Sequence, residues 1–137
     1  MGNKESFKAF SPLAGGIARQ GETCGAIIGA LAALGLVIGR EEIQDTDTYR
    51  KAMTPAAEIY QCFRKEIKKE FAFKEALRGT TCRHLHKRLY GRVFDLTKPE
   101  EFQAFLDAGG HSDKGCPKVC AIAARVAGEM LVKLIPN

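Results

Sequence analysis

The sequence predicts an all-α fold, a compact bundle of about four to five helices around a central apolar helix. Three observations predict it. An uncharged run extends from Gly25 to Gly39, apolar residues recur at steps of three and four elsewhere, and no segment alternates as a half-buried strand would. The 137 residues, 45% of them hydrophobic and 27% charged, fit a single helical domain with a sizeable core.

The amino-terminal half is expected to begin with an irregular, glycine-rich lead-in at residues 1–22. The uncharged run predicts the central helix at about residues 24–38, and a short helical stretch is allowed near residues 48–53. Thr54 and Pro55 then have the pattern of an N-cap followed by proline at the first helical position. The helix that follows carries apolar residues at four-residue steps, which place it on the core: Ile59, Phe63, Ile67 and Phe71.

Three more helices are predicted in the carboxy-terminal half. One begins at Thr81–Cys82 and stops at Gly91. A capping-box pattern at residues 97–100 opens the next helix, which ends at residues 109–110. The last helix begins at Cys116–Pro117 and presents one apolar stripe: Val119, Ile122, Val126, Met130 and Ile135.

The net charge of +5 does not by itself indicate a nucleic-acid partner. Basic residues are mixed with acidic ones, as in residues 64–70, which is typical of a solvated helix face. The chain has no Trp and no recognisable nucleic-acid-binding motif, so we expect no nucleic acid. The uncharged run is shorter than the roughly 20 residues that cross a bilayer, so we expect no membrane insertion. The short, polar N-terminus does not resemble a signal peptide, which favours a cytoplasmic protein.

The chain has five cysteines, and three of them, Cys24, Cys82 and Cys116, lie at or beside a predicted helix start. A helix N-terminus offers unpaired N–H groups and the positive end of the helix dipole, and both favour a thiolate. Cysteines in a cytoplasmic protein are more often catalytic or metal-binding than structural. We therefore predict Cys24, Cys82 and Cys116 as catalytic thiols.

The remaining cysteine and histidine side chains receive different interpretations. Cys62 lies in mid-helix beside the apolar stripe, and we interpret it as a small buried hydrophobe. His84 and His111 are interpreted as surface histidines. Cys120 follows Cys116 by one helical turn, and His86 follows Cys82 in the same way. The four side chains of these two pairs would form a Cys₃His zinc set if the two helices met: Cys82, His86, Cys116 and Cys120.

The stretch Gly-Glu-Thr-Cys-Gly-Ala-Ile-Ile-Gly at residues 21–29 resembles the CGAxxG motif of the C_GCAxxG_C_C family of redox-active proteins, which are small prokaryotic proteins. Cys24 matches the motif cysteine, and Cys82 and Cys116 match the two downstream family cysteines in order. The resemblance extends from about Gly15 to the C-terminus. It implies redox chemistry at these cysteines, and the family has no established substrate.

The sequence departs from the family pattern at its beginning. The family has a further cysteine upstream, in an N-terminal helix, and no cysteine precedes Cys24 here. Cys62 and Cys120 are the candidates to replace it. A missing or truncated helix would expose part of the central helix, so we expect a homodimer.

Three functions remain open from the sequence. The first is thiol-disulfide or electron-transfer chemistry with an unknown redox partner. The second uses the same cysteines as ligands, with Cys24 or His86 completing the set, so that the cofactor is none, zinc or an iron-sulfur cluster. The third is a non-catalytic helical interaction module whose cysteines are inert.

Overall fold

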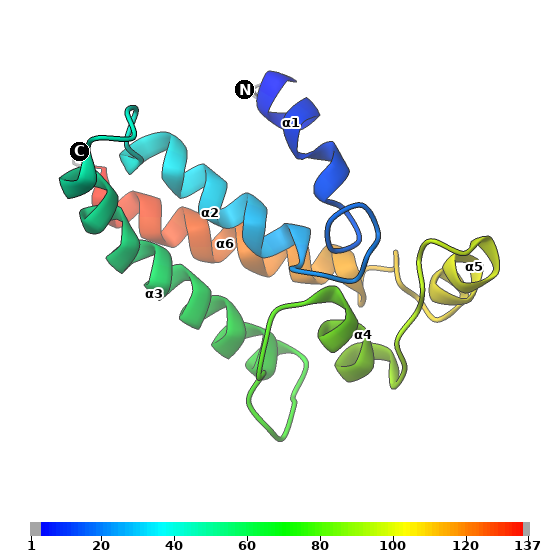
Figure 1. The fold of residues 1–137 in the computed structure, drawn as a ribbon. Helices are drawn as coiled ribbons and strands as arrows, with labels where there is room; N and C mark the ends of the chain where they lie inside the picture. Colours follow the sequence, from blue (N-terminus) through cyan, green and yellow to red (C-terminus); the bar gives the residue numbers. More distant parts are fainter. Residues whose placement is uncertain (1–3, 136–137) are drawn as a thin grey trace.

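The computed structural model describes residues 4–135 and confirms the all-α prediction. Six α-helices and one short 3-10 helix follow one another along the chain, and no strand occurs in the described part (Figure 1). Their bounds are α1 Lys4–Phe10, η1 Ser11–Leu13, α2 Gly25–Ile38, α3 Thr46–Glu70, α4 Cys82–Tyr90, α5 Pro99–Asp107 and α6 Cys116–Leu134. None of these helices combines the length and apolar character needed to cross a membrane.

The three long helices α2, α3 and α6 pack against one another and enclose the main core. Figure 1 shows them side by side, with the starts of α2 and α6 at the end of the bundle where α4 and α5 lie. Each contributes one apolar stripe, because residues three and four apart share a helix face. The most deeply buried core side chains on these helices are Ile27, Leu34, Ile59, Phe63, Ile67 and Val119.

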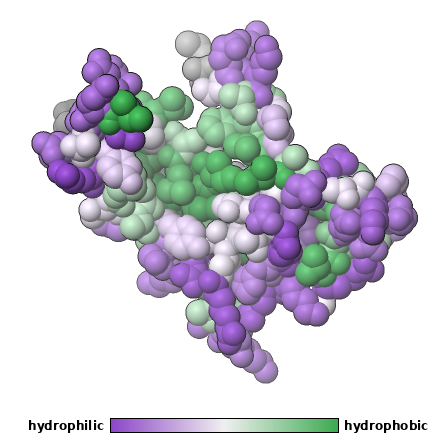
Figure 2. All heavy atoms as spheres, in the orientation of Figure 1, coloured by the Kyte–Doolittle hydropathy of each residue, from purple (hydrophilic) through white to green (hydrophobic). Residues whose placement is uncertain are grey.

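The apolar helix α2 buries one face only. Ile27, Ala30 and Leu34 face the core, whereas Leu36 is 71% exposed and Val37 is 47% exposed. Figure 2 shows apolar residues gathered on the surface between α1 and α2. This surface remains open because α1 projects away from the bundle and buries none of its own residues (Figure 1).

Helix α3 is longer than the sequence predicts. It begins at Thr46 and continues through Pro55, where the sequence pattern places a new helix start. Asp45 caps the actual start by accepting a hydrogen bond from the Thr48 N–H at 3.0 Å. Ala52 is buried and extends the apolar stripe by two turns toward the N-terminus. The packing of this stripe compensates for the backbone hydrogen bond that is missing at Pro55, because proline has no N–H to donate.

Three other boundaries differ from the prediction. The lead-in contains α1, so residues 4–10 are helical rather than irregular. At the start of α5 the capping box is absent, because the Thr97 hydroxyl donates to Asp95 Oδ1 and Lys98 occupies the N-cap position. Helix α5 ends at Asp107, two residues before the predicted glycine stop. The predicted ends of α4 are confirmed, because Thr81 caps its start and Gly91 ends it with a left-handed φ of 77°.

A second, smaller apolar cluster lies beyond the main core. Phe94, Leu96 and Phe105 are buried there. Tyr90, Phe102 and Cys116 pack against them from α4, α5 and the start of α6. This cluster holds α4 and α5 against the starts of α2 and α6, which is where the predicted catalytic cysteines lie.

Candidate dithiol site

Main-chain hydrogen bonds bring Cys24 and Cys82 together from distant parts of the sequence. The Cys24 N–H donates to the Thr80 carbonyl at 2.8 Å, and the Cys82 N–H donates to the Glu22 carbonyl at 2.7 Å. Thr23 and Thr81 form the antiparallel bridge between these two bonds. The segments that lead into α2 and α4 therefore lie side by side, and the two helices begin at the same place.

The Arg83 side chain reinforces this junction. Its Nε and Nη2 donate to the carbonyls of Gly21 and Gln20 at 3.2 and 2.9 Å, and Nη2 also pairs with the Glu22 carboxylate at 2.5 Å. The guanidinium thus binds three consecutive residues of the preceding loop with its planar set of donors. The junction is a clamp made of backbone and Arg83, independent of the cysteine side chains.

Cys24 is the N-cap residue of α2, and its thiol is activated there. A hydrogen bond from the Cys82 thiol, followed by the N–H groups of Ala26 and Ile27, lowers the pKa of Cys24 from 9.0 to about 7, although burial acts in the opposite direction. Close to half of the Cys24 side chains are therefore thiolates at neutral pH.

Cys82 behaves in the opposite way, although it also lies in the first turn of a helix. It is buried, with 6% of its surface exposed. Its hydrogen bond to Cys24, its burial and the charge of Cys24 all raise the pKa of Cys82. One proton is thus shared unequally between the two sulfurs, with Cys24 as the thiolate and Cys82 as the donor.

Cys116 occupies the first turn of α6, and its neighbour is Tyr90. The Tyr90 hydroxyl lies 3.6 Å from the Cys116 sulfur. Burial raises the pKa of Cys116 despite this hydrogen bond. A helix start alone therefore does not activate a thiol in this protein, because the hydrogen bond to Cys24 together with burial raises the pKa of Cys82, and burial raises the pKa of Cys116.

A cavity of about 670 Å³ joins these groups at the end of the bundle. Four of the five cysteines line it, and the fifth, Cys62, does not. Cys62 is exposed on α3, so its interpretation as a buried hydrophobe is wrong. At about 100° per residue it lies roughly 60° from Ile59 on the side away from Phe63, and so outside the buried stripe.

The three histidines lie in three different environments. His86 is buried, with 2% of its surface exposed, and stacks on Phe105 at 5.0 Å between ring centroids. Its Nδ1 has no hydrogen-bond partner, and burial lowers its pKa, so the ring is neutral. His111 is exposed as the sequence indicates, whereas His84 is half-buried with an unpartnered Nε2.

The predicted zinc ligands share the cavity without forming a coordination set. Cys82, His86, Cys116 and Cys120 all line it. Between residues 4 and 135, however, no three or more His, Cys, Asp or Glu side chains are grouped closely enough to hold a metal ion. The metal-binding alternative remains a prediction from spacing, with no support from the geometry.

Sequence reasoning missed the aromatic wall and the basic group of the cavity. Phe102, Phe105 and Arg19 line it together with the thiols. The two phenylalanines are one turn apart on a predicted helix. This spacing indicates an apolar helix face, but it does not show which residues pack against that face. Arg19 lies in the glycine-rich loop before Cys24, where a left-handed backbone at residues 15–19 was not recognisable from the sequence.

Fold and site together define an all-α protein with an activated cysteine beside a protonated one in a thiol-lined cavity. A family model described as "putative redox-active protein (C_GCAxxG_C_C)" matches residues 1–130, and the chain belongs to this family. The match begins upstream of Gly15, where the resemblance read from the motifs began. No curated protein and no solved structure matches the chain.

Proposed function

We propose that the protein carries out thiol–disulfide exchange, with Cys24 as the nucleophile and Cys82 as the resolving thiol. The observation that carries the proposal is the hydrogen bond from Cys82 to Cys24, which lowers the pKa of Cys24 to about 7 while the pKa of Cys82 is raised. An unequal pair of this kind provides an attacking thiolate at neutral pH and a second thiol beside it.

In the first step the Cys24 thiolate attacks one sulfur of a substrate disulfide, R–S–S–R′. A bond forms between Cys24 and the R sulfur, the S–S bond breaks, and R′–S⁻ leaves and takes a proton from solvent. The negative charge on Cys24 disappears in this step. Because the hydrogen bond to Cys24 and the charge of Cys24 both raise the pKa of Cys82, that pKa falls once the mixed disulfide has formed.

In the second step Cys82 transfers its proton to the departing R–S⁻ group and attacks the Cys24 sulfur. A Cys24–Cys82 disulfide forms and R–SH is released. The substrate has then gained two electrons and two protons, which the two cysteines have lost. A dithiol of the unknown redox partner reverses the exchange and restores both thiols. The order of the steps follows from the charge, because Cys82 becomes acidic only after Cys24 has reacted.

Cys116 is proposed as a second resolving thiol. It lines the same cavity, and the charge of Cys24 contributes to its raised pKa. When Cys24 forms the mixed disulfide, its negative charge disappears. The pKa of Cys116 therefore falls together with that of Cys82. If Cys116 acts in this way, a mixed disulfide on Cys24 should last longer in the double variant Cys82→Ser/Cys116→Ser than in Cys82→Ser alone.

The test is to trap the first intermediate. Cys82→Ser, treated with one equivalent of a small disulfide, should accumulate a mixed disulfide on Cys24, found by intact mass and peptide mapping. The unmodified chain should instead form the Cys24–Cys82 disulfide and lose two hydrogens. Cys62→Ser, on the exposed face of α3, is the matched control and should behave like the unmodified chain. Equal and slow modification of all five cysteines would contradict the proposal.

A further inference from the structure

We propose that the substrate is a small disulfide with an aromatic body and an anionic end group, which enters the cavity beside Cys24 and places its charge on Arg19. This inference rests on the proposed function and names the class of molecule on which it acts. Three independent features of the cavity carry it: its size with the burial of its thiols, its aromatic lining and the charge of Arg19.

The size of the cavity and the burial of the two thiols favour a small molecule over a disulfide on a protein surface. The cavity of about 670 Å³ lies within the usual range for small-molecule sites, and its lining is mostly apolar. Cys82 has only 6% of its surface exposed, and Cys24 is half-buried beside it. A reacting disulfide must therefore enter the cavity to reach either sulfur.

Part of the cavity lining is aromatic. Phe102 and Phe105 come from α5, and the His111 ring meets them edge-on at 6.1 and 5.5 Å between centroids. His86 stacks on Phe105, and its buried Nδ1 lacks a partner. Phe10 of α1 adds a further ring to the lining. Phe105 and His86 are each only 2% exposed and back this surface, so the rings that can meet a bound molecule are those of Phe102, His111 and Phe10. Rings of this kind bind a planar aromatic body by stacking and edge contacts better than they bind an aliphatic chain.

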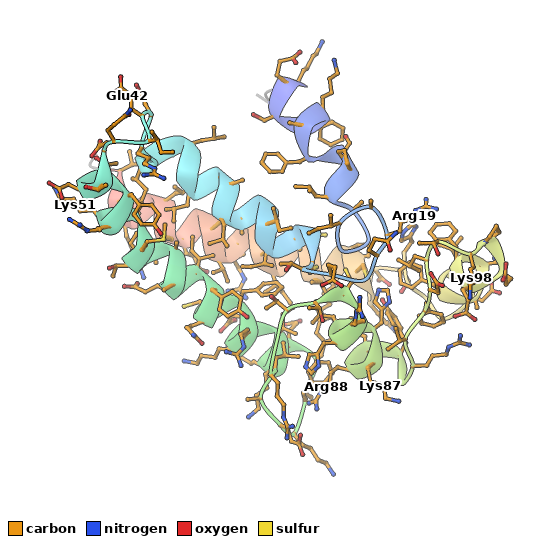
Figure 3. The ribbon with its side chains drawn as sticks, in the orientation of Figure 1. Arg19, Glu42, Lys51, Lys87, Arg88 and Lys98 are labelled. Atoms are coloured by element: carbon orange, nitrogen blue, oxygen red, sulfur yellow. The ribbon has the colours of Figure 1, made fainter. Side chains whose placement is uncertain are left out.

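Arg19 supplies the positive charge. Its guanidinium lies 4.5 Å from the centroid of Phe102, so it extends the aromatic wall at the rim of the cavity. Figure 3 shows Arg19 on the loop between the bundle and α5. The loop holds it there through a run of left-handed residues, with φ of 60°, 49° and 64° at Ile17, Ala18 and Arg19. Three adjacent non-glycine residues in this conformation store strain, which is common at binding sites.

The Arg19 charge has no carboxylate partner among residues 4–135. Of the acidic residues in the adjacent polar groove, Glu101 pairs with Arg92 at 2.5 Å and Asp95 with Lys98 at 3.5 Å. Glu100 also lines that groove, beyond salt-bridge distance of Arg19. An unpaired guanidinium beside an aromatic surface is suited to a carboxylate or another oxyanion on an aromatic ligand.

The experiment compares two aromatic disulfide probes that differ in charge. Dithiobis(nitrobenzoate) carries carboxylates, and dithiodipyridine is neutral at neutral pH. Stopped-flow rates are measured for the unmodified chain, for Arg19→Gln and for Lys51→Gln, which removes a positive charge at the far end of α3 (Figure 3). We expect Arg19→Gln to slow the anionic probe about tenfold and the neutral probe much less, because only the anion loses a charge-assisted contact. Lys51→Gln should change neither rate.

Two further measurements separate a binding role of Arg19 from a structural one. Added salt should slow the anionic probe with the unmodified chain and have much less effect with Arg19→Gln, since screening acts on the charge that was removed. Phe102→Leu should slow both aromatic probes relative to oxidised glutathione, which has carboxylates and no ring. A folding defect would slow all three disulfides alike.

The outcomes distinguish this inference from the proposed function. Equal effects of Arg19→Gln on both probes, or a disulfide of a folded protein reacting faster than either probe, would overturn the substrate class and leave thiol–disulfide exchange intact. If Cys24→Ser retained the fast reaction, the proposed function itself would fail.

Discussion

Replacing Cys82 by alanine should weaken the thiolate of Cys24, because the hydrogen bond from Cys82 makes the largest contribution to its low pKa. The N–H groups of Ala26 and Ile27 remain in the variant, and burial still acts against ionisation. These opposing effects should leave the pKa near its ordinary value of 9.0.

The expected effect on the rate follows from two opposing factors. At pH 7 a pKa of about 7 gives about half thiolate, and a pKa of 9.0 gives about one part in a hundred, so the reactive fraction falls about fifty-fold. A more basic thiolate is also a better nucleophile, by about eightfold over two pKa units in disulfide exchange. The net result is a reaction about sixfold slower at pH 7 and faster at high pH.

The assay is the rate of exchange with neutral dithiodipyridine from about pH 5 to about pH 10. The unmodified chain should show an inflection near pH 7 that is absent in Cys24→Ser. In Cys82→Ala the inflection should move toward pH 9, and in Cys62→Ala it should not move. An inflection that stays near pH 7 in Cys82→Ala would refute the reasoning and assign the activation to the α2 amides alone.

Three other predictions concern stability and assembly. The pKa of Cys24 is lower in the folded chain than the ordinary 9.0, so its contribution to the free energy of unfolding is present above pH 9 and is lost as the pH falls toward 7. Urea unfolding should show a rise of at most about 2–3 kcal/mol between these pH values, and Cys24→Ser should abolish it. Gly16→Ala should destabilise the chain by at least about 1 kcal/mol more than Gly91→Ala, because both glycines have positive φ but only the Gly16 Cβ would lie 2.5 Å from the Glu22 carbonyl oxygen. Equal urea midpoints for these two variants would show that the loop relaxes around the methyl group. The homodimer remains a prediction, and sedimentation should give twice the chain mass of 15.0 kDa. Replacing Leu36 on the exposed face of α2 by lysine should give the monomer. Finding only monomer for the unmodified chain at micromolar concentration would contradict the prediction.

The helices could be predicted from the sequence where one signal dominated. The apolar run of α2, the threonine cap and glycine stop of α4, and the stripe of α6 as far as Met130 are local patterns that the structure reproduces. Ile135, the last predicted member of that stripe, lies beyond the end of α6 and is 51% exposed. The prediction was wrong where packing outweighed a local pattern. Pro55 by itself indicates a helix start, but it lies inside α3. The helical period of α3 also places Cys62 outside the buried stripe, because Cys62 lies roughly 60° from Ile59 on the side away from Phe63.

The candidate site was predictable in its members and not in its chemistry. Helix-start spacing and the family motif both indicated Cys24, Cys82 and Cys116, and all three line one cavity. The sequence could not show that only one of them has a lowered pKa. That difference depends on burial and on hydrogen bonds between segments that are distant in the chain.

The clamp between the starts of α2 and α4 has a consequence for how the protein matures. Cys24 acquires its low pKa only when residues 80–83 dock on residues 20–24, which closes a loop that contains α2 and α3. Contacts that close so long a loop form late in folding. A chain emerging from the ribosome therefore carries ordinary, weakly reactive thiols. Its reactivity develops with the native topology, and the rate at which Cys24 becomes reactive reports on the completion of folding.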